Sequence, residues 1–273
     1  MEAALKVVSF NVKRDSIFCR AHAWKNRREL VARIIRESNA AIVGVQELMP
    51  AMKEDIRKRL TDYSIFGWGR TRKYTDEHAA ILLHNTDTAA LSDQTIWLSK
   101  HPEKSGSRAY FSVFPRICTI CEVFSKELNC KIRVFNTHFD HICGPARTLG
   151  VRIILEYMHR LGVKEKLPTI LMGDFNARPG SKPVRMLTEN LHPYTDIHLT
   201  NIYSRFDQDK IHNSYHGFRG TRKGRRPIDY IFVSDDFEIE DAYLDHSNLN
   251  GYYPSDHFPL VAVLGLKKSR TTA

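Results

Sequence analysis

The sequence predicts an α+β fold, a four-layer α/β/β/α sandwich in which two mixed β-sheets face each other and helices lie outside. The first observation is that strand-like apolar runs outnumber helical patterns, so helices cannot cross over between every pair of strands as in a parallel doubly wound sheet. The second is that the 273-residue chain has no internal repeat and no low-complexity linker. We therefore expect a single domain over residues 1–273 that ends in a short basic tail.

Short apolar runs, rich in β-branched and aromatic residues, predict the strands. In chain order these are Leu5–Val12, Ala41–Gln46, Ala79–Leu83, Arg116–Phe124, Lys131–Thr137, Thr169–Met172, Ile228–Val233 and Phe258–Leu264. Trp24–Ser38 predicts a helix because its apolar residues form one stripe opposite charged residues. Pro145–Leu161 repeats apolar residues every three or four positions, and proline suits a first helical turn. Met49–Leu60 is a shorter helical candidate.

Composition is that of an ordinary globular protein, with 42% hydrophobic and 26% charged residues. No apolar run approaches the roughly 20 residues of a membrane-spanning helix, so we expect no span. A strand-like run at Leu5–Phe10 also argues against a standard secretory signal. The five scattered cysteines indicate a reducing compartment, and we expect a cytoplasmic monomer. Cys118 and Cys121 form a C-x-x-C on a predicted strand, where an odd separation favours buried thiols over a zinc or redox site.

The net charge of +10 favours a partner that carries phosphate, whether nucleic acid, anionic lipid or a small ester. Part of the positive charge gathers in a glycine-rich stretch that contains Arg219, Arg222, Lys223, Arg225 and Arg226. This stretch is either a solvated loop or a phosphate-binding loop, in which case Arg222 and Arg225 are candidate contacts.

Polar residues follow four of the predicted strands, at the point where each strand ends. These residues are Asn11, Gln46 with Glu47, the segment 138–141, and the segment 174–176. Any one of them could simply begin a turn. Because strand ends hold the backbone while the adjoining loops stay open to ligands, the four together predict a functional site.

Side-chain alternation refines this prediction. Asp174 and Asn176 are two residues apart, so they should project to the same side. By the same rule His138 and Asp140 should share one side, and His141 should face away.

Asp229 requires a charged partner, because it lies on the apolar face of its predicted strand. His257, in a segment directly before the last predicted strand, is the candidate partner. Such a pair raises the pKa of the imidazole and selects its tautomer, which suits a residue that holds a phosphate oxygen or a catalytic proton.

The ordered motifs S-F-N, Q-E, N-T-H, G-D-F-N, I-D-Y and S-D-H resemble the endonuclease/exonuclease/phosphatase superfamily of deoxyribonuclease-I-like, metal-dependent phosphoesterases. The resemblance extends from Asn11 to His257 and is to the small single-domain bacterial branch. It implies that Glu47 is the principal ligand of Mg²⁺ or Mn²⁺. Asn11 and Asp256 would complete the protein side of the metal site, directly or through water.

The resemblance also implies catalytic roles. Asp174 would orient and deprotonate the attacking water, while Asn176 would hold that water or a phosphate oxygen. His138 and His257 would donate to the non-bridging oxygens, with Asp229 bracing His257.

Substrate contacts are less defined: Arg116, Asp140 and His141 are candidates beside the two arginines of the basic loop. The expected activity is divalent-metal-dependent hydrolysis of a phosphate ester, by in-line attack of water activated by Asp174. The positive charge favours a nuclease or phosphodiesterase. A phosphomonoesterase acting on a sugar or inositol phosphate is the alternative.

Two other classes fit the sequence less well. A non-catalytic basic module that binds nucleic acid has no evident use for Glu47, Asp174 and Asp256, which would repel a polyanion. A zinc hydrolase of the metallo-β-lactamase type would have Asn136 in place of the first histidine of its H-x-H-x-D-H motif, which leaves a poor zinc site.

Overall fold

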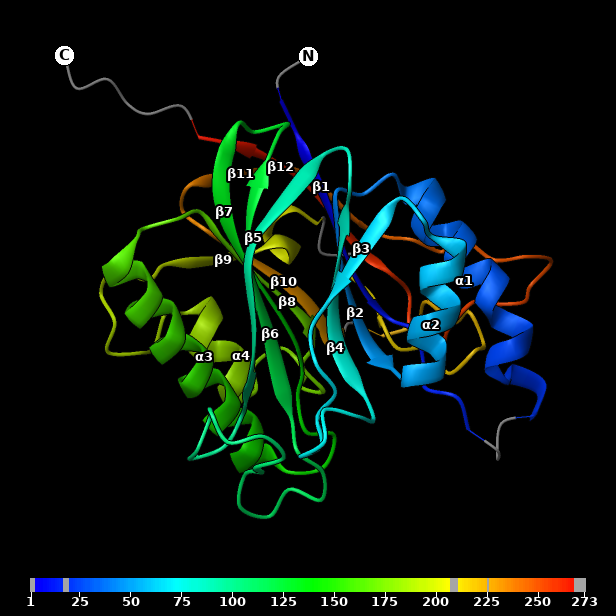
Figure 1. The fold of residues 1–273 in the computed structure, drawn as a ribbon, viewed down its shortest axis with the longest axis horizontal. Coiled ribbons are helices and arrows are strands. Elements are labelled where there is room, and N and C mark those ends of the chain that lie inside the picture. The colour runs from blue at the N-terminus through cyan, green and yellow to red at the C-terminus, as the bar shows by residue number, and fades with distance from the viewer. Residues whose placement is uncertain (1–2, 17–19, 207–210, 225, 268–273) are drawn as a thin grey trace.

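Two six-stranded mixed sheets form the centre of the molecule (Figure 1). The computed structural model describes residues 3–16, 20–206, 211–224 and 226–267. In spatial order, the first sheet contains β11 (Phe237–Leu244), β12 (Leu260–Leu266), β1 (Leu5–Asn11), β2 (Ile42–Leu48), β4 (His78–His84) and β3 (Tyr63–Phe66). The second contains β5 (Thr88–Trp97), β6 (Ile117–Ser125), β7 (Cys130–His138), β8 (Thr169–Asp174), β10 (Asp229–Ser234) and β9 (Leu199–Asn201).

Each sheet has one parallel pair among antiparallel neighbours. β1 runs parallel to β2, and β7 runs parallel to β8. The carboxyl ends of these four strands lie at the same end of the sandwich (Figure 1). The predicted mixed sheets are therefore confirmed.

Helices cover the outer face of each sheet (Figure 1). α1 (Trp24–Ser38) and α2 (Pro50–Arg59) pack on the first sheet, where Val31 of α1 and Ile56 of α2 share a buried apolar cluster with Val43 of β2. α3 (Gly144–Lys164) and α4 (Lys182–Thr188) lie over the second sheet. Two short 3-10 helices, η1 (Arg20–His22) and η2 (Ile202–Arg205), complete the described elements. The four-layer prediction is confirmed.

The eight predicted strands are the interior strands of the two sheets. The four that the pattern did not predict, β3, β5, β9 and β11, are the four sheet edges. Edge strands are half solvated and often short, so their apolar signal is weak. Leu91 through Gln94 of β5, for example, are all exposed. The seven-residue α4 was also not predicted.

Asn136 and Gln46 form a buried polar link between the sheets. The Gln46 amide donates to Asn136 Oδ1 at 2.7 Å, and Asn136 Nδ2 donates to the backbone carbonyls of Val45 and Ala80. Because Asn136 is fully used in the core, the structure gives no support to a zinc motif that begins at this position.

Three further expectations can be compared with the structure. Cys118 and Cys121 are buried free thiols, as predicted. Among the described residues, none of the helices combines the length and apolarity that crossing a membrane requires. The predicted basic tail beyond residue 267 lies outside the described residues.

Candidate active site

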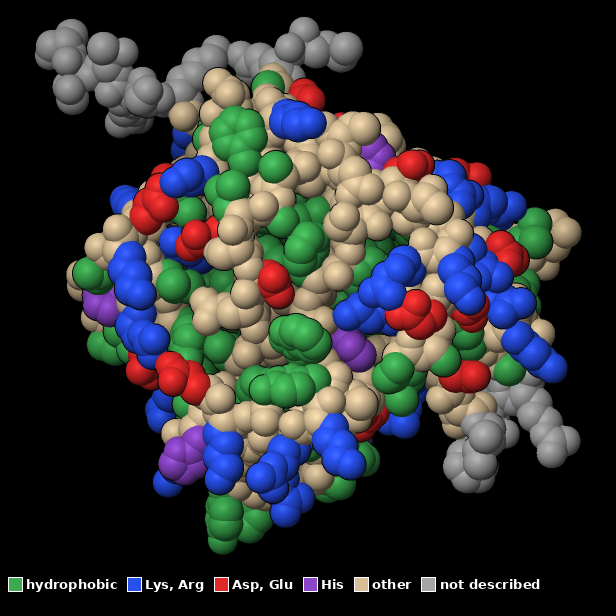
Figure 2. All heavy atoms as spheres, viewed as in Figure 1, with side chains coloured by type: hydrophobic (Ala, Val, Ile, Leu, Met, Phe, Trp, Pro, Cys, Tyr) green, Lys and Arg blue, Asp and Glu red, His purple; other side chains and the backbone are tan. Residues whose placement is uncertain are grey.

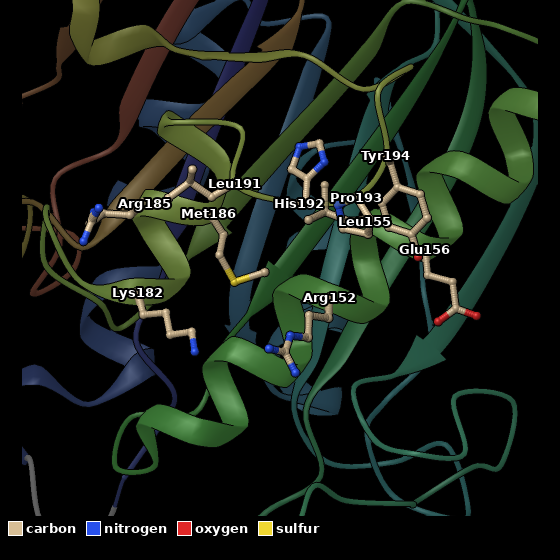
Figure 3. Close-up of a pocket in the computed structure, with 10 residues that line it drawn as sticks. All are labelled: Arg152, Leu155, Glu156, Lys182, Arg185, Met186, Leu191, His192, Pro193 and Tyr194. Atoms are coloured by element: carbon tan, nitrogen blue, oxygen red, sulfur yellow. The ribbon is translucent and has the colours of Figure 1, made fainter.

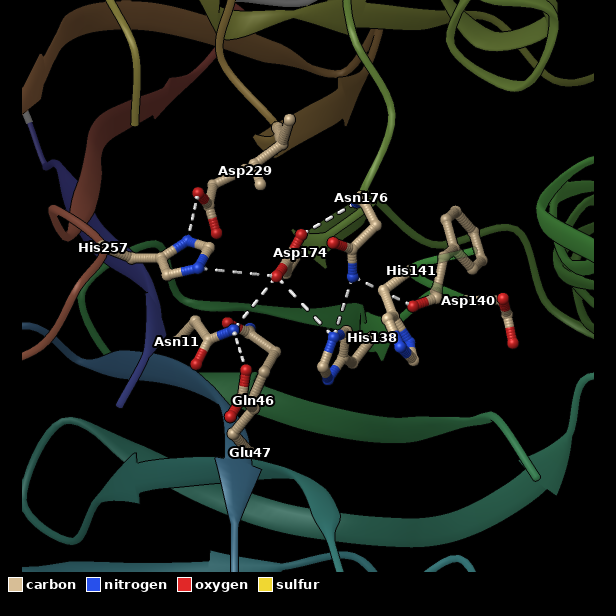
Figure 4. A network of polar contacts seen from close by, with 12 residues as sticks. Asn11, Gln46, Glu47, His138, Asp140, His141, Asp174, Asn176, Asp229 and His257 are labelled. Carbon is tan, nitrogen blue, oxygen red and sulfur yellow. Dashed lines mark hydrogen bonds and ion pairs between the residues drawn. The ribbon is translucent and has the colours of Figure 1, made fainter. Parts of the chain in front are cut away.

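The candidate residues from distant parts of the chain meet at one end of the sandwich (Figure 4). Asn11 and Glu47 come from β1 and β2 of the first sheet, whereas His138 and Asp174 come from β7 and β8 of the second. Glu47, His138 and Asp174 line a cleft of about 520 Å³. Its lining consists of Lys13, Arg14, Glu47, Arg70, Glu77, Phe114, Arg116, His138, His141, Asp174, Asn176, Tyr215, Ile228 and His257.

Asp174 lies at the centre of this group and is 1% exposed. Its Oδ2 accepts a hydrogen bond from Asn11 Nδ2 at 3.0 Å and lies 3.6 Å from His138 Nε2 and 3.9 Å from His257 Nε2. Its Oδ1 accepts from the backbone N–H of Asn176 at 2.8 Å. Both Asp174 and Asn176 line the cleft, but β8 ends at Asp174 and Asn176 has a positive φ of 48°, so strand alternation does not account for the position of Asn176.

His257 is in contact with its predicted partner. Its Nδ1 lies 2.8 Å from Asp229 Oδ2, and Asp229 is directly opposite Asp174 in the pairing of β10 with β8. Burial alone would lower the pKa of His257, but the charges of Asp229 and Asp174 outweigh it and raise that pKa to about 10. Burial and the charge of Asp229 raise the pKa of Asp174, although the neighbouring histidines oppose this change.

His138 has a carboxylate partner that the sequence analysis missed. Its Nδ1 lies 2.5 Å from Oε1 of the buried Glu77, which also pairs with Arg70 at 2.9 Å and Arg116 at 3.5 Å. Burial would raise the pKa of Glu77, but these positive neighbours hold it well below its usual range. The sequence feature that could have identified Glu77 is its position directly before a strand, β4. Because β4 runs antiparallel to β2, β4 begins at the end of the sheet where β2 finishes.

Three of these contacts join the two sheets across the cleft. The pairs are Asn11 with Asp174, Glu77 with His138, and His257 with Asp229. In each pair one residue belongs to a strand of the first sheet or lies just before one, and its partner belongs to the second sheet.

Two further carboxylate residues, Glu47 and Asp256, lie near Asp174. Glu47 has a positive φ of 59° at a bulge in the pairing of β2 with β4, and its Oε1 accepts from Asn11 Nδ2 at 3.1 Å. The ammonium of Lys13 lies 3.2 Å from Asp256 Oδ2 and 4.0 Å from Glu47 Oε2. Burial would raise the pKa of Asp256, but the charges of His257 and Lys13 lower it.

Metal binding is chemically possible in this region. Ligand atoms of the buried residues Asp174, Asp229 and His257 lie within 4.8 Å of one another, so these three could hold a metal ion. However, the hydrogen bond between His257 and Asp229 already occupies one ligand atom of each residue.

The less defined candidates lie just before β6 and just after β7, and they differ in where their side chains point. Arg116 and His141 line the cleft and are 2.8 Å apart between Nη2 and Nδ1. Asp140 points away from Asp174 (Figure 4) and accepts from Ser112 Oγ and from the backbone N–H groups of residues 142 and 143. Alternation was wrong here because β7 ends at His138 and the chain bends afterwards.

The segment before the basic loop contributes a cleft residue that was not predicted. Tyr215 lines the cleft, and its ring centre is 5.1 Å from that of His257. Arg222 is exposed and is not among the cleft-lining residues, while Arg225 lies outside the described residues.

A second cavity, of about 680 Å³, lies between α3, α4 and the segment 191–194 (Figure 3). It is more apolar, and none of the candidate catalytic residues lines it. The chemistry of the molecule therefore concentrates in the cleft between the sheets.

Two carboxylate-bound histidines lie beside a buried aspartate at the end of a two-sheet sandwich, an arrangement suited to the hydrolysis of phosphate esters. The chain belongs to the endonuclease/exonuclease/phosphatase family, whose model matches residues 8–257. Its fold is the deoxyribonuclease-I-like fold of that family.

The similarity to known proteins covers almost the whole chain. A family protein from Bacteroides thetaiotaomicron superposes with a TM-score of 0.87 at 25% identity, covering 98% of this chain and 99% of its own. A mannosyl-6-phosphatase from the same species has a TM-score of 0.85 at 27% identity, covering 95% and 99%. An uncharacterized protein of Acanthamoeba polyphaga mimivirus is 25% identical over 279 residues, covering 95% of this chain and 99% of its own.

Proposed function

We propose that the protein is a divalent-metal-dependent phosphodiesterase in which Asp174 activates water for in-line attack on phosphorus. The observation that carries this proposal is the position of Asp174, a buried carboxylate flanked by two histidines that each have a carboxylate partner. Hydrolysis requires an activated water, positive charge for the phosphoryl oxygens and a stabilised leaving group.

Asp174 is suited to orient and deprotonate water. The Asn176 N–H holds one of its oxygens, and the other oxygen faces both histidines. The side chain of Asn176 lies beside His138, with Nδ2 at 2.9 Å from Nε2, so it can hold the same water or a phosphate oxygen.

The two histidines are suited to donate to non-bridging phosphate oxygens. His257 has its Nδ1 on Asp229, which leaves Nε2 toward the cleft. His138 has the equivalent arrangement through Glu77. Charge-assisted donors of this kind stabilise the negative charge that develops in the transition state.

Glu47, Asp256 and Asn11 fit a hard divalent cation. They offer carboxylate and amide oxygens, which are the ligands that Mg²⁺ and Mn²⁺ prefer. The Lys13 ammonium, which pairs with both Glu47 and Asp256, supports a site for positive charge at this position. A bound Mg²⁺ or Mn²⁺ supplies charge that neutralises the phosphoryl oxygens. We place the cation here because these three residues offer oxygen ligands alone, whereas the alternative group, Asp174 with Asp229 and His257, includes an imidazole nitrogen.

The net charge of +10 supports nucleic acid as the substrate class. A sugar phosphatase is the second candidate, supported by the similarity to a mannosyl-6-phosphatase. We also infer that residues 1–273 act as one domain and work as a cytoplasmic monomer.

Removing the metal tests the proposed chemistry. We expect hydrolysis of bis-p-nitrophenyl phosphate to stop in EDTA and to return with Mg²⁺ or Mn²⁺, as measured by nitrophenolate release. Activity that resists EDTA would contradict the proposed metal dependence. Parallel assays with p-nitrophenyl phosphate and mannose 6-phosphate distinguish the two substrate classes, since faster turnover of these monoesters would favour the phosphatase.

Glu77→Gln tests the partner of His138. The neutral amide keeps the shape of the side chain but replaces the carboxylate that contacts Nδ1 of His138, so the ring loses the partner that orients its Nε2 and we expect kcat to fall about 10²-fold. Steady-state kinetics on the diester, alongside thermal unfolding, provide the measurement. Glu54→Gln is the matched control because Glu54 is exposed on α2. If Glu77→Gln and this control had equal kcat values, Glu77 would have no role in catalysis.

A further inference from the structure

We propose that two loops beside the cleft form a binding surface for an extended single strand of nucleic acid. The loops span residues 67–77, between β3 and β4, and 98–116, between β5 and β6. This rim surface consists of the aromatic residues Trp68, Tyr74, Tyr110, Phe111 and Phe114 and the basic residues Arg72, Lys73, Lys100 and Lys104, all of them exposed. The inference rests on the proposed phosphodiesterase function and names the shape of its substrate.

The two loops form one continuous surface that reaches the cleft. Ser105 Oγ donates to the Arg72 carbonyl at 3.3 Å, and Gly106 packs so closely on Arg72 that a Cβ would come within 2.7 Å of its backbone nitrogen. Phe114 lines the cleft and covers the guanidinium of Arg70, whose carbon lies 4.6 Å from the ring centre. Both loops lie at the end of the sandwich where β2, β7 and β8 finish (Figure 1).

The aromatic side chains of the rim surface are available for stacking. Tyr110 is 77% exposed and Phe111 is 74% exposed, and their ring centres are 3.9 Å apart. Trp68 is 55% exposed and forms a second pair with Tyr74 at 5.4 Å. Exposed rings that lie beside one another are typical of interaction sites.

The positive charge of the rim surface is not neutralised by neighbouring acids. Among the described residues, none of its four basic side chains forms an ion pair, whereas Arg28 of α1 and Arg59 of α2 both pair with Asp55. Asp76, in the same loop as Arg72, pairs with Arg70, and Glu103 faces Arg160 of α3. The lower part of Figure 2 shows Lys and Arg side chains gathered directly beside hydrophobic ones.

Exposed rings beside unpaired cations favour a single strand over a duplex. Aromatic side chains stack on the faces of unpaired bases, while lysine and arginine bind the adjoining phosphates. A duplex hides its base faces, and a sugar phosphate has no bases to stack on the exposed rings. The aromatic residues also continue from the loops into the cleft at Phe114, along the path that a strand would take to the reactive phosphate.

Oligonucleotide binding tests this inference. Fluorescence anisotropy in EDTA, where we expect no turnover, measures the affinity of the full chain for a labelled dT12 strand, an RNA strand of equal length and the corresponding duplex. We expect Trp68→Ala to weaken single-strand binding about 5- to 100-fold. The double variant Lys100→Glu/Lys104→Glu should also lower the slope of log affinity against log salt by at least about 1.4.

Matched controls separate this inference from the proposed function. Arg57→Glu/Lys58→Glu, on the exposed side of α2, makes the same change in net charge and should leave strand binding within twofold. All variants should hydrolyse bis-p-nitrophenyl phosphate with Mg²⁺ at the wild-type rate. If the wild-type protein did not hydrolyse bis-p-nitrophenyl phosphate, the proposed phosphodiesterase function would be refuted. If hydrolysis were normal and the rim variants bound the single strand as tightly as the wild type, only the proposed rim surface would be refuted.

A membrane is the other class of partner with an affinity for aromatic and basic side chains. Cosedimentation with phosphatidylserine vesicles tests it directly. Vesicle binding that the rim variants abolish, with no change in strand binding, would overturn the inference.

Discussion

We expect Asp174→Asn to lower kcat for diester hydrolysis by about 10³-fold, because an amide cannot take a proton from the attacking water. The substitution keeps the size of the side chain, and the amide oxygen can still accept from Asn11, so the three contacts that join the sheets should largely persist. It also removes a buried carboxylate that lies opposite another, Asp229, and we therefore expect no large fall in the unfolding temperature.

The measurement is kcat for bis-p-nitrophenyl phosphate at saturating Mg²⁺, with thermal unfolding of the same preparations. Asp235→Asn is the matched control, because it removes one carboxylate from an exposed turn. If Asp174→Asn retained the rate of this control, Asp174 would not be the residue that activates water.

Glu47→Gln should have the second largest effect on activity. We expect it to act by weakening metal binding rather than by impairing proton transfer. The amide preserves the shape of the side chain at the bulge but removes a full negative charge from the oxygen donor set. We expect the Mg²⁺ concentration for half-maximal activity to rise at least about tenfold, as for the loss of a ligand charge. Activity at saturating Mg²⁺ should also fall.

Mg²⁺ activation curves and calorimetric titration of the protein with Mn²⁺ provide two independent readouts. Glu37→Gln, which removes an exposed charge from α1, is the control. An unchanged Mn²⁺ affinity in Glu47→Gln would move the metal site elsewhere, and the group of Asp174, Asp229 and His257 would then be the first position to test.

The fold could be predicted from the sequence where strands are buried and not where they are exposed. β8 is buried along nearly its whole length, so the apolar run Thr169–Met172 is enough to identify it as a strand. β11 alternates buried Phe237 and Ile239 with exposed Glu238 and Glu240, and a run of this kind resembles a loop as much as a strand. Exposure to solvent at the sheet edges therefore removes the signal on which the prediction depends.

The candidate site could be predicted only in part, because the sequence shows where strands end but not which strand ends lie next to each other. Asn11, Glu47 and Asp174 were found because each lies at the carboxyl end of a strand. Glu77 was missed because it lies at the amino end of β4, and only the antiparallel pairing with β2 brings that end to the cleft. Pairing order is a tertiary property that local periodicity does not contain. Lys13 was missed because its contacts with Glu47 and Asp256 depend on residues far away in the chain.

Three hydrogen-bonded pairs of the cleft each connect one sheet to the other, and this makes catalysis sensitive to how the sheets slide. A small shear between them would misalign all three pairs at once while leaving each sheet internally intact. Gly44, where a Cβ would approach Met172 Sδ to 2.7 Å, is a place where such a shear could originate. Substitutions deep in the interface between the sheets can therefore impair turnover long before they unfold the protein.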